Sequence, residues 1–388
     1  MKLEAQPLQM NGLKPQAPCP LGASIMAAAG AANGARLLDV RICADTKGAA
    51  HEALPQFRPA GGHERMNTKE DLIAPLMRRV EEKLAATLKG TQEEQAVNAM
   101  CSQVVKSGGK RLRPRLALLS WLCLDPAPSE QALERAVIFA SAIELLHTAT
   151  LIHDDVIDRA DMRRGSPTLN STDGNHAAVL AGDYMFTRAF IGFNELNSRP
   201  LYSEIVAAVT ALVSGELDQL REQGDLGIGR KSYYRTIYCK TGALFSVSCC
   251  GAALLNGADE AAVKALRDYG TLLGEGFQIA DDILDYSASS PVTGKDSGED
   301  LADGRVTLPL IIALEEAGAE RARLEEAARG NDLATVKAFM EKCGALEKAQ
   351  QCADESARAA VKALSALPDS KPRQALEALA AAAARRSF

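Results

Sequence analysis

The chain has 388 residues, of which 47% are hydrophobic and only 4% aromatic, and its formal net charge is −6. Alanine and leucine dominate while strand-like runs of Val, Ile, Thr and Tyr are scarce, so the composition predicts an all-α fold in one large domain or two. The acidic balance provides no basic surface for nucleic acid, which we therefore exclude as a partner.

Cysteine usage and hydropathy predict a reduced, cytoplasmic protein. The nine cysteines are scattered and form no CxxC pair, which is typical of free thiols in a reducing compartment. The stretch AVIFASAIELLHTATLI is interrupted by Glu144, His147 and two threonines. We therefore expect no transmembrane segment.

The first 65 residues differ in composition from the rest of the chain. Residues 1–65 are rich in Pro, Ala and Gly without a sustained helical period, which predicts a disordered N-terminal extension. Its scattered acidic residues argue against a transit peptide. The stretch MNTKEDLIAPLMRRVEEKLAATL then begins a helix, with Thr68 as the expected N-cap. We expect residues 66–388 to form the helical domain, and hypothesise that Met66 is the true start.

The remaining chain alternates helical patterns with short Gly, Pro or Asn breaks. The first chemically distinctive stretch is VVKSGGKRLRPRL, where Lys110, Arg111, Arg113 and Arg115 follow a Gly-Gly break. Arginine forks match phosphate geometry, and glycine lets the backbone approach closely. The alternative is a set of surface cations near a helix end.

Three aspartates follow an apolar helical run in LIHDDVIDRADMRRG, at Asp154, Asp155 and Asp158. Neighbouring carboxylates repel, so they form either a solvated helix face or a cation site. His147 shares a helix face with Asp154 and Asp158, which favours a place in the same site over a simple core position. Arg163 and Arg164 stand directly after the cluster.

The acidic pattern occurs again in GFQIADDILDY, at Asp281, Asp282 and Asp285, with Gln278 one turn earlier on the acidic face. Two clusters in matched contexts indicate two sites, each with carboxylates that share a helix face. Such sites suit Mg²⁺, which is usually held by one or two carboxylates together with phosphate oxygens and water. An EF-hand needs ligands spread through a loop with a central glycine, which neither cluster has.

The stretches GGKRLRP, LIHDDVIDRADMRRG, CKTGALFS and GFQIADDILDY…GKDSGEDLADGRVTLPLI together resemble the trans-type polyprenyl diphosphate synthases over residues 70–320. The resemblance implies a large single-domain helical bundle of the isoprenoid synthase type, with the aspartate clusters facing each other across a central cavity. It implies that isopentenyl diphosphate is condensed with an allylic diphosphate, and that the enzyme is a homodimer.

The resemblance also assigns roles to individual positions. It implies Mg²⁺ ligation by the aspartates Asp154, Asp155, Asp158, Asp281, Asp282 and Asp285. It implies diphosphate binding by the basic residues Lys110, Arg113, His147, Arg163, Arg164 and Lys295. It implies catalytic contacts near the allylic group and the carbocation by Lys240, Thr241 and Gln278. Arg305 stands where many relatives have lysine, and we leave it out of the expected site.

Product length depends on the positions four and five residues before the first aspartate, where relatives that stop early tend to carry a bulky aromatic. Thr150 and Ala149 stand there and are small, so the resemblance implies a long-chain product. Phe190 or Phe193 on the next helix are candidates for a tunnel floor, although aromatic residues are more often plain core.

Several alternatives stay open. One is a short-chain farnesyl or geranylgeranyl diphosphate synthase. A class I terpene cyclase would normally replace the second aspartate motif and would not need GGKRLRP. A non-catalytic partner subunit would be expected to lose aspartates or basic residues, all of which are present here. A helical scaffold with acidic faces would show no Mg²⁺-dependent release of diphosphate.

Overall fold

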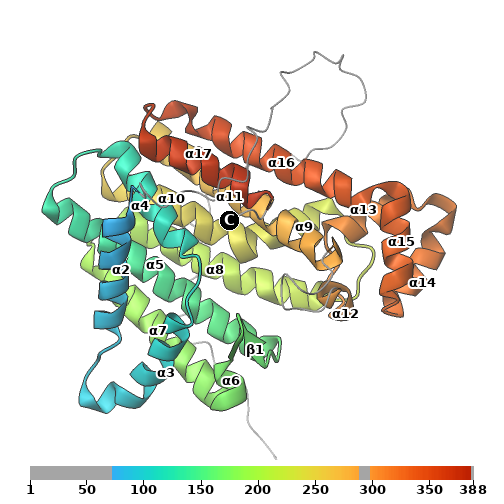
Figure 1. Cartoon of the computed structure of the whole chain (residues 1–388), viewed down its shortest axis with the longest axis horizontal. Coiled ribbons are helices and arrows are strands. Elements are labelled where there is room, and N and C mark those ends of the chain that lie inside the picture. Colours follow the sequence, from blue (N-terminus) through green and yellow to red (C-terminus); the bar gives the residue numbers. More distant parts are fainter. Residues whose placement is uncertain (1–71, 288–297, 386–388) are drawn as a thin grey trace, which may run out of the picture. The chain divides into compact units, whose positions relative to one another are not determined.

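The computed structural model describes residues 72–287 and 298–385, which are almost entirely helical (Figure 1). The strands among these residues are β1 (Met162–Arg163) and β2 (Ser166–Pro167), which form one short antiparallel hairpin. The prediction of an all-α fold is confirmed. The predicted extension 1–65, Met66, Thr68 and Lys295 lie outside the described residues.

The helices before the second aspartate cluster are α2 (Ala74–Thr87), η2 (Gln92–Glu94), α3 (Gln95–Lys106), α4 (Leu112–Leu124), α5 (Glu130–Ile157), α6 (Leu169–Thr172), α7 (Asn175–Glu195), α8 (Arg199–Glu222), α9 (Arg230–Ile237), η3 (Tyr238–Gly242) and α10 (Ala243–Leu255). The others are α11 (Glu260–Ser287), α12 (Glu299–Ala302), α13 (Leu308–Glu316), η4 (Gly318–Glu320), α14 (Arg321–Arg329), α15 (Leu333–Cys343), α16 (Ala345–Ala363), η5 (Leu364–Ala366) and α17 (Lys371–Ala383).

Helix α2 begins later in the chain than the sequence suggested. Its first residue is Ala74, and Leu72 and Ile73 form a turn rather than a helix. The expectation of one helix running through residues 72 and 73 is therefore wrong, whereas the expected N-cap, Thr68, lies outside the described residues. Pro75 explains the difference, because proline is favoured in the first turn of a helix, where its missing N–H costs nothing.

Helix α5 is the central element that carries the first aspartate cluster. It begins after Ser129, whose hydroxyl accepts a hydrogen bond from the Ala132 N–H at 3.2 Å. Its apolar residues are buried on several sides, including Ile143 and Leu146, which are fully buried. Helix α7 packs along it, and α4 and α10 pack against other parts of it (Figure 1). This burial fixes the direction in which its C-terminal aspartates point.

Helix α11 carries the second cluster and packs between α10 and α16. Its approach to α10 depends on glycine: a Cβ at Gly270 would lie 2.5 Å from the Phe245 carbonyl oxygen, and one at Gly274 would lie 2.8 Å from the Gly242 Cα. Only glycine allows backbones to meet this closely. The KTG stretch lies opposite in η3, a π-helical turn of a kind often found at functional sites.

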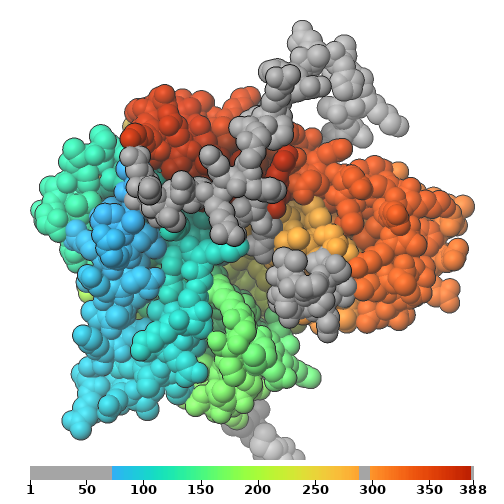
Figure 2. Space-filling view, in the orientation of Figure 1, coloured from blue at the N-terminus to red at the C-terminus, as the bar shows by residue number. Residues whose placement is uncertain are grey.

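The C-terminal helices complete the core around α11. Helices α16 and α17 pack on one another, and α13 and α15 contact each other next to α16 (Figure 1). In the space-filling view α14 and α15, in orange, form one end of the described helices, well apart from α2 and α3 in blue (Figure 2). A second apolar cluster, which includes Ile279, Leu308 and Ala353, fills the space between α11, α13 and α16.

Within the described part of the chain, two helical stretches have the length and hydropathy of membrane spans. They are Glu130–Ile157 and the continuous run Arg230–Leu255, whose most apolar windows are 72% and 83% buried inside the fold. That degree of burial is typical of core helices, which pass the same test of length and composition. The sequence analysis had judged the first of these runs too interrupted to qualify.

Candidate active site

The first aspartate cluster stands where α5 ends. Asp154 is half-buried and Asp155 buried, whereas Asp158 caps the helix and is exposed. Arg159 then adopts a positive φ of 52°, which ends the helix and turns the chain into the β1–β2 hairpin. Burial raises the pKa of Asp154 to about 6, although the nearby Lys240 opposes that shift.

The hairpin separates the two neighbouring arginines. Arg163 pairs with Ser166 across the strands, while Arg164 and Gly165 form the two-residue turn with φ of 52° and 77°. The Arg163 Nε donates to Asp155 Oδ1 at 2.5 Å. This pair borders a pocket of about 730 Å³ that extends toward α3.

Arg164 points to the Gly-Gly break that precedes α4. Its Nη1 donates to the Gly108 carbonyl at 2.5 Å. A Cβ on Gly109 would lie 2.4 Å from the same Nη1, so the glycine makes room for the guanidinium. The stretch KSGGKR and the stretch DMRRG therefore meet in space, as a shared basic site requires. Lys110, next to this break, is exposed.

Arg111 and Arg113 have different surroundings although they are near neighbours in sequence. Arg111 donates to Glu81 at 2.8 Å, to Glu144 at 2.9 Å and to the Val105 carbonyl at 2.7 Å, so its donors are engaged within the fold. The Nε of Arg113 is buried and has no hydrogen-bond partner in the described part of the chain. Arg113 therefore has donors available for a ligand.

Cations are crowded around His147, on the helix face that leads to Asp154. Burial lowers the pKa of Arg113 to about 10, and the charge of Arg164 adds to the shift. Burial, with Arg113 and Arg164 next, holds the pKa of His147 well below its usual value. Bases that are buried beside one another without enough negative charge are stabilised by an anion.

In the second cluster, Asp282 is buried and held by a chain of hydrogen bonds. The Thr241 hydroxyl donates to Gln278 Oε1 at 2.8 Å, and the Gln278 Nε2 donates to Asp282 Oδ1 at 2.9 Å. The Tyr233 hydroxyl donates to Asp282 Oδ2 at 2.6 Å. Thr241 and Gln278 thus fix the orientation of Asp282, and Tyr233 is a partner that no sequence motif indicated.

Asp285 is engaged with the next segment of the chain. Its carboxylate accepts the backbone N–H groups of Glu299 at 3.1 Å and Asp300 at 3.2 Å. Asp300 itself lies beside Asp285 and Asp281, and burial, with Asp285 next, raises its pKa to about 7. Asp300 is a further carboxylate of this site that the sequence analysis missed, although it stands in the quoted stretch GEDLADGR.

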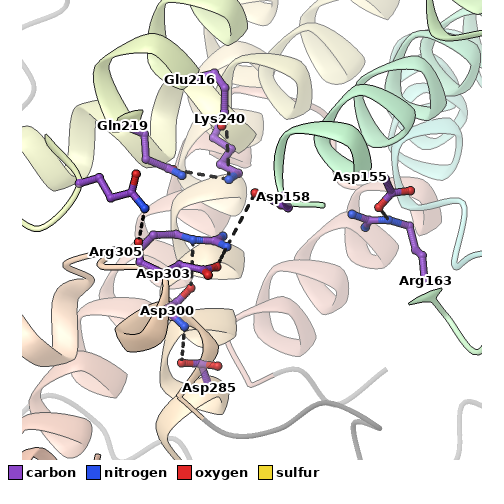
Figure 3. A network of polar contacts seen from close by, with 11 residues as sticks. Asp155, Asp158, Arg163, Glu216, Gln219, Lys240, Asp285, Asp300, Asp303 and Arg305 are labelled. Carbon is purple, nitrogen blue, oxygen red and sulfur yellow. Dashed lines mark hydrogen bonds and ion pairs between the residues drawn. The ribbon is translucent and has the colours of Figure 1, made fainter. Parts of the chain in front are cut away.

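Arg305 lies between the two aspartate regions (Figure 3). One Nη is 3.8 Å from Asp158 Oδ1, and its Nε is 3.9 Å from Asp300 Oδ1, while Asp303 contacts it closely. The sequence analysis left Arg305 out, yet its guanidinium is within ion-pair distance of residues from both regions. Figure 3 also shows Asp158 turned toward Arg305, and Asp155 paired separately with Arg163.

Lys240 reaches the same space from η3. Its Nζ lies 3.5 Å from Gln219 Oε1 and 3.9 Å from Glu216 Oε2, both on α8 (Figure 3). Neither α8 residue belongs to a motif, so only the fold could reveal them. The structure thus brings Lys240 near Asp154, as its effect on the pKa of that carboxyl shows.

The carboxylates fit a hard divalent ion only if phosphate oxygens and water complete its coordination. Within 72–287 and 298–385, no three His, Cys, Asp or Glu side chains are close enough to hold a metal by themselves. Burial raises the pKa of Asp154, Asp282 and Asp285, so a cation would stabilise their charged forms. All-oxygen donors of this kind suit Mg²⁺ that is also bound by phosphate oxygens and water.

Comparison with known proteins identifies the family. The polyprenyl synthetase family model matches residues 94–343. The octaprenyl diphosphate synthase of Haemophilus influenzae is 39% identical over 316 residues, which cover 80% of this chain and 94% of that protein.

Solved structures agree. A decaprenyl diphosphate synthase from Rhodobacter capsulatus aligns with a TM-score of 0.76 and 34% identity, over 82% of this chain and 98% of that one. A polyprenyl synthase from Caulobacter crescentus, complexed with calcium and isoprenyl diphosphate, aligns with a TM-score of 0.76 and 32% identity, over 85% and 100% of the two chains. The chain therefore belongs to the polyprenyl synthetase family and is a chain-extending trans-prenyltransferase.

Proposed function

We propose that this enzyme condenses isopentenyl diphosphate with an allylic diphosphate to form a long all-trans polyprenyl diphosphate. The observation that carries the proposal is charge complementarity. The half-buried Asp154 on α5 and the buried Asp282 on α11 have raised pKa values, and the half-buried bases Arg113 and His147, near the α5 carboxylate, have lowered ones. An assembly of divalent cation and diphosphate satisfies both groups at once.

The proposed metal ligands are the aspartates of the two clusters, with Mg²⁺ as the ion. Asp154 and Asp158 share a helix face, and Asp281 and Asp285 share another. When bound, Mg²⁺ would supply charge stabilisation for the departing diphosphate. Asp282 is expected to present its carboxylate to the ion in a fixed orientation, because both of its carboxylate oxygens already accept hydrogen bonds.

The chain's own cations would share that work. Lys240, Arg163 and Lys295 are proposed to hold the allylic diphosphate, whose C–O bond breaks to leave a carbocation. Lys110, Arg113, His147 and Arg164 are proposed to hold isopentenyl diphosphate, whose double bond attacks that cation. A proton is then lost from the new chain, with the released diphosphate as the base. Positioning replaces a covalent nucleophile.

A long product is supported by the relatives, and the two small residues before Asp154 allow a test of product length. The relatives named above are an octaprenyl and a decaprenyl diphosphate synthase. Ala149 is fully buried, and it shares a helix face with Ala142, which would touch a Cβ on Gly192 of α7. Ala149 therefore faces α7, whereas Thr150 is half-buried and closer to the Asp154 direction. A Thr150→Phe variant is expected to shorten the products.

We also propose a homodimer with the cytoplasm as its location. Helix α8 exposes an apolar stripe made of Tyr202, Val206, Val213, Leu217 and Leu220. These positions fall on one side of the helix, and an exposed stripe of this kind suits a second copy of the chain. The cysteines in the described part, seven in number, are all free, which suits a reducing compartment.

One assay tests the reaction and the product together. Purified protein is incubated with Mg²⁺, labelled isopentenyl diphosphate and a farnesyl or geranylgeranyl primer, and the products are sized by chromatography. Long prenyl diphosphates are expected. Products that stop at farnesyl or geranylgeranyl length would favour the short-chain alternative. No condensation with any primer would favour a non-catalytic partner subunit.

A further inference from the structure

The Phe245 ring lies under a guanidinium of the proposed site. The Arg113 Cζ is 4.6 Å from the centroid of this ring. Phe245 is 1% exposed, so the contact is shielded from water. The ring also contacts Phe277 of α11, with centroids 5.5 Å apart. The position of Arg113 on α4 is thus tied to α10 and α11.

Arg113 has few other contacts that could hold it in place. Its Nε is buried without a hydrogen-bond partner among the described residues. The acid that raises its pKa most is Glu144, which is already bonded to Arg111 at 2.9 Å. Arg164, close by, repels it. Stacking on an aromatic face is therefore a main stabilising contact of this buried cation.

Stacking leaves the guanidinium able to bind a ligand. The N–H donors of arginine lie in the plane of the group, whereas the attraction to a ring acts through its face. A carboxylate in place of the ring would use these donors and would repel a diphosphate. An aromatic face offsets part of the desolvation cost while the donors stay available to phosphate oxygens.

We propose that Phe245 is a positioning residue for isopentenyl diphosphate, which it serves by holding the Arg113 guanidinium through a cation–π contact. This inference rests on the proposed function, in which Arg113 binds that substrate. It predicts that the electron density of the Phe245 ring, and not only its shape, sets the affinity for isopentenyl diphosphate. The allylic substrate, held by other cations, is expected to be insensitive to the ring.

The experiment replaces Phe245 with mono-, di- and trifluorinated phenylalanine by nonsense suppression in the full-length chain. Fluorination keeps the shape of the ring but weakens its attraction for a cation. We expect KM for isopentenyl diphosphate to rise with each fluorine, to about tenfold for the trifluoro ring, because a desolvated cation–π contact is of that strength. Calorimetry should show the same trend in Kd, with KM for the allylic primer unchanged.

The control is the same fluorinated series at Phe139, which is equally buried but contacts Phe193 instead of a cation. A flat response at Phe245, or an equal rise in the Phe139 series, would overturn the inference. Phe245→Trp should keep the affinity and Phe245→Leu should lose it. Arg113→Gln tests the underlying assignment separately: an unchanged KM for isopentenyl diphosphate would refute the role of Arg113 itself.

Discussion

At the residue scale, neighbours in sequence have different roles because their donors meet different partners. Arg111 is bonded to Glu81 and Glu144. Arg113, two residues later, stacks on Phe245 and keeps donors available for a ligand. The same holds for Asp281 and Asp282, since the second is buried and fixed by Tyr233. Residue type alone would not separate the members of either pair.

Replacement of Asp154 or Asp281 by alanine tests the proposed metal ligands. We expect turnover to fall by about two orders of magnitude or more, because each variant removes charge that would hold Mg²⁺ at the leaving group. Circular dichroism should show unchanged helical content. Asp161→Ala, which alters an exposed aspartate after the first cluster, is the control. Near-normal turnover in both variants would rule out these ligand roles.

His147 gives a prediction about pH and stability. Its pKa is lowered in the fold by burial and nearby arginines, so the unfolded chain binds a proton more readily. The stability that neutral His147 contributes is complete above its unfolded pKa of about 6.5 and is lost as pH falls below that value. Relative to His147→Gln, the wild-type protein should lose about 1.4 kcal/mol of unfolding free energy per pH unit there. Urea unfolding of both proteins between pH 7.5 and 5.5 measures this loss. Unfolding free energies that change in parallel with pH in the two proteins would contradict the prediction.

The sequence could predict those parts of the site in which helical periodicity determines which residues share a face. The shared face of His147, Asp154 and Asp158 follows from spacing alone. Asp300 and Tyr233 could not be predicted, because their contacts join segments that are distant in sequence or lie in irregular loops. Arg305 was left out because many relatives have lysine at that position, and its place in the chain gives no information about which carboxylates its guanidinium reaches.

At the element scale, the position of the second aspartate cluster depends on how closely α11 packs against α10 and η3. Helix α11 meets the α10 backbone through Gly270 and meets η3 through Gly274. The sequence predicted both helices but not this contact, since glycine inside a helix normally indicates only lower stability. The start of α2 was misjudged for a related reason: a capping pattern was given more weight than Pro75.

Gly270→Ala tests that packing. The new Cβ would lie 2.5 Å from the Phe245 carbonyl oxygen, so the helices must separate. We expect a net loss of about 1–3 kcal/mol in unfolding free energy, despite the better helix propensity of alanine. Gly192→Ala is the control, because there the nearest atom is the Ala142 methyl carbon at 3.1 Å. Denaturant titration of both variants should rank Gly270→Ala as the less stable.

At the scale of the whole molecule, the described helices form one fold whose exposed apolar stripe on α8 suits a second copy. Val213 and Leu217 are 57% and 51% exposed, although both belong to a long and otherwise well-packed helix. Burial of such side chains between two copies would remove apolar surface from water. Composition predicted the fold class, but an apolar residue in the sequence does not reveal whether a core or a partner covers it.

Val213→Glu together with Leu217→Glu tests the dimer. Two buried, unpaired charges at an interface are strongly unfavourable, so the double variant should be a monomer by light scattering after gel filtration. Ala359→Glu adds a charge at an exposed position of another helix, α16, and should leave the mass unchanged. A wild-type protein that already runs as a monomer would contradict the proposal.

The β1–β2 hairpin has a consequence for the distance between the two proposed diphosphate sites. Arg163 stands on a strand and bonds to Asp155, while Arg164 stands in the turn and bonds to Gly108. Two adjacent residues of one short loop thus point to different partners, and in the proposed reaction they bind different diphosphates. An extra residue inserted between Arg163 and Arg164 would preserve every charge but change the distance between the two guanidinium groups. The length of this loop therefore matters as much as its composition.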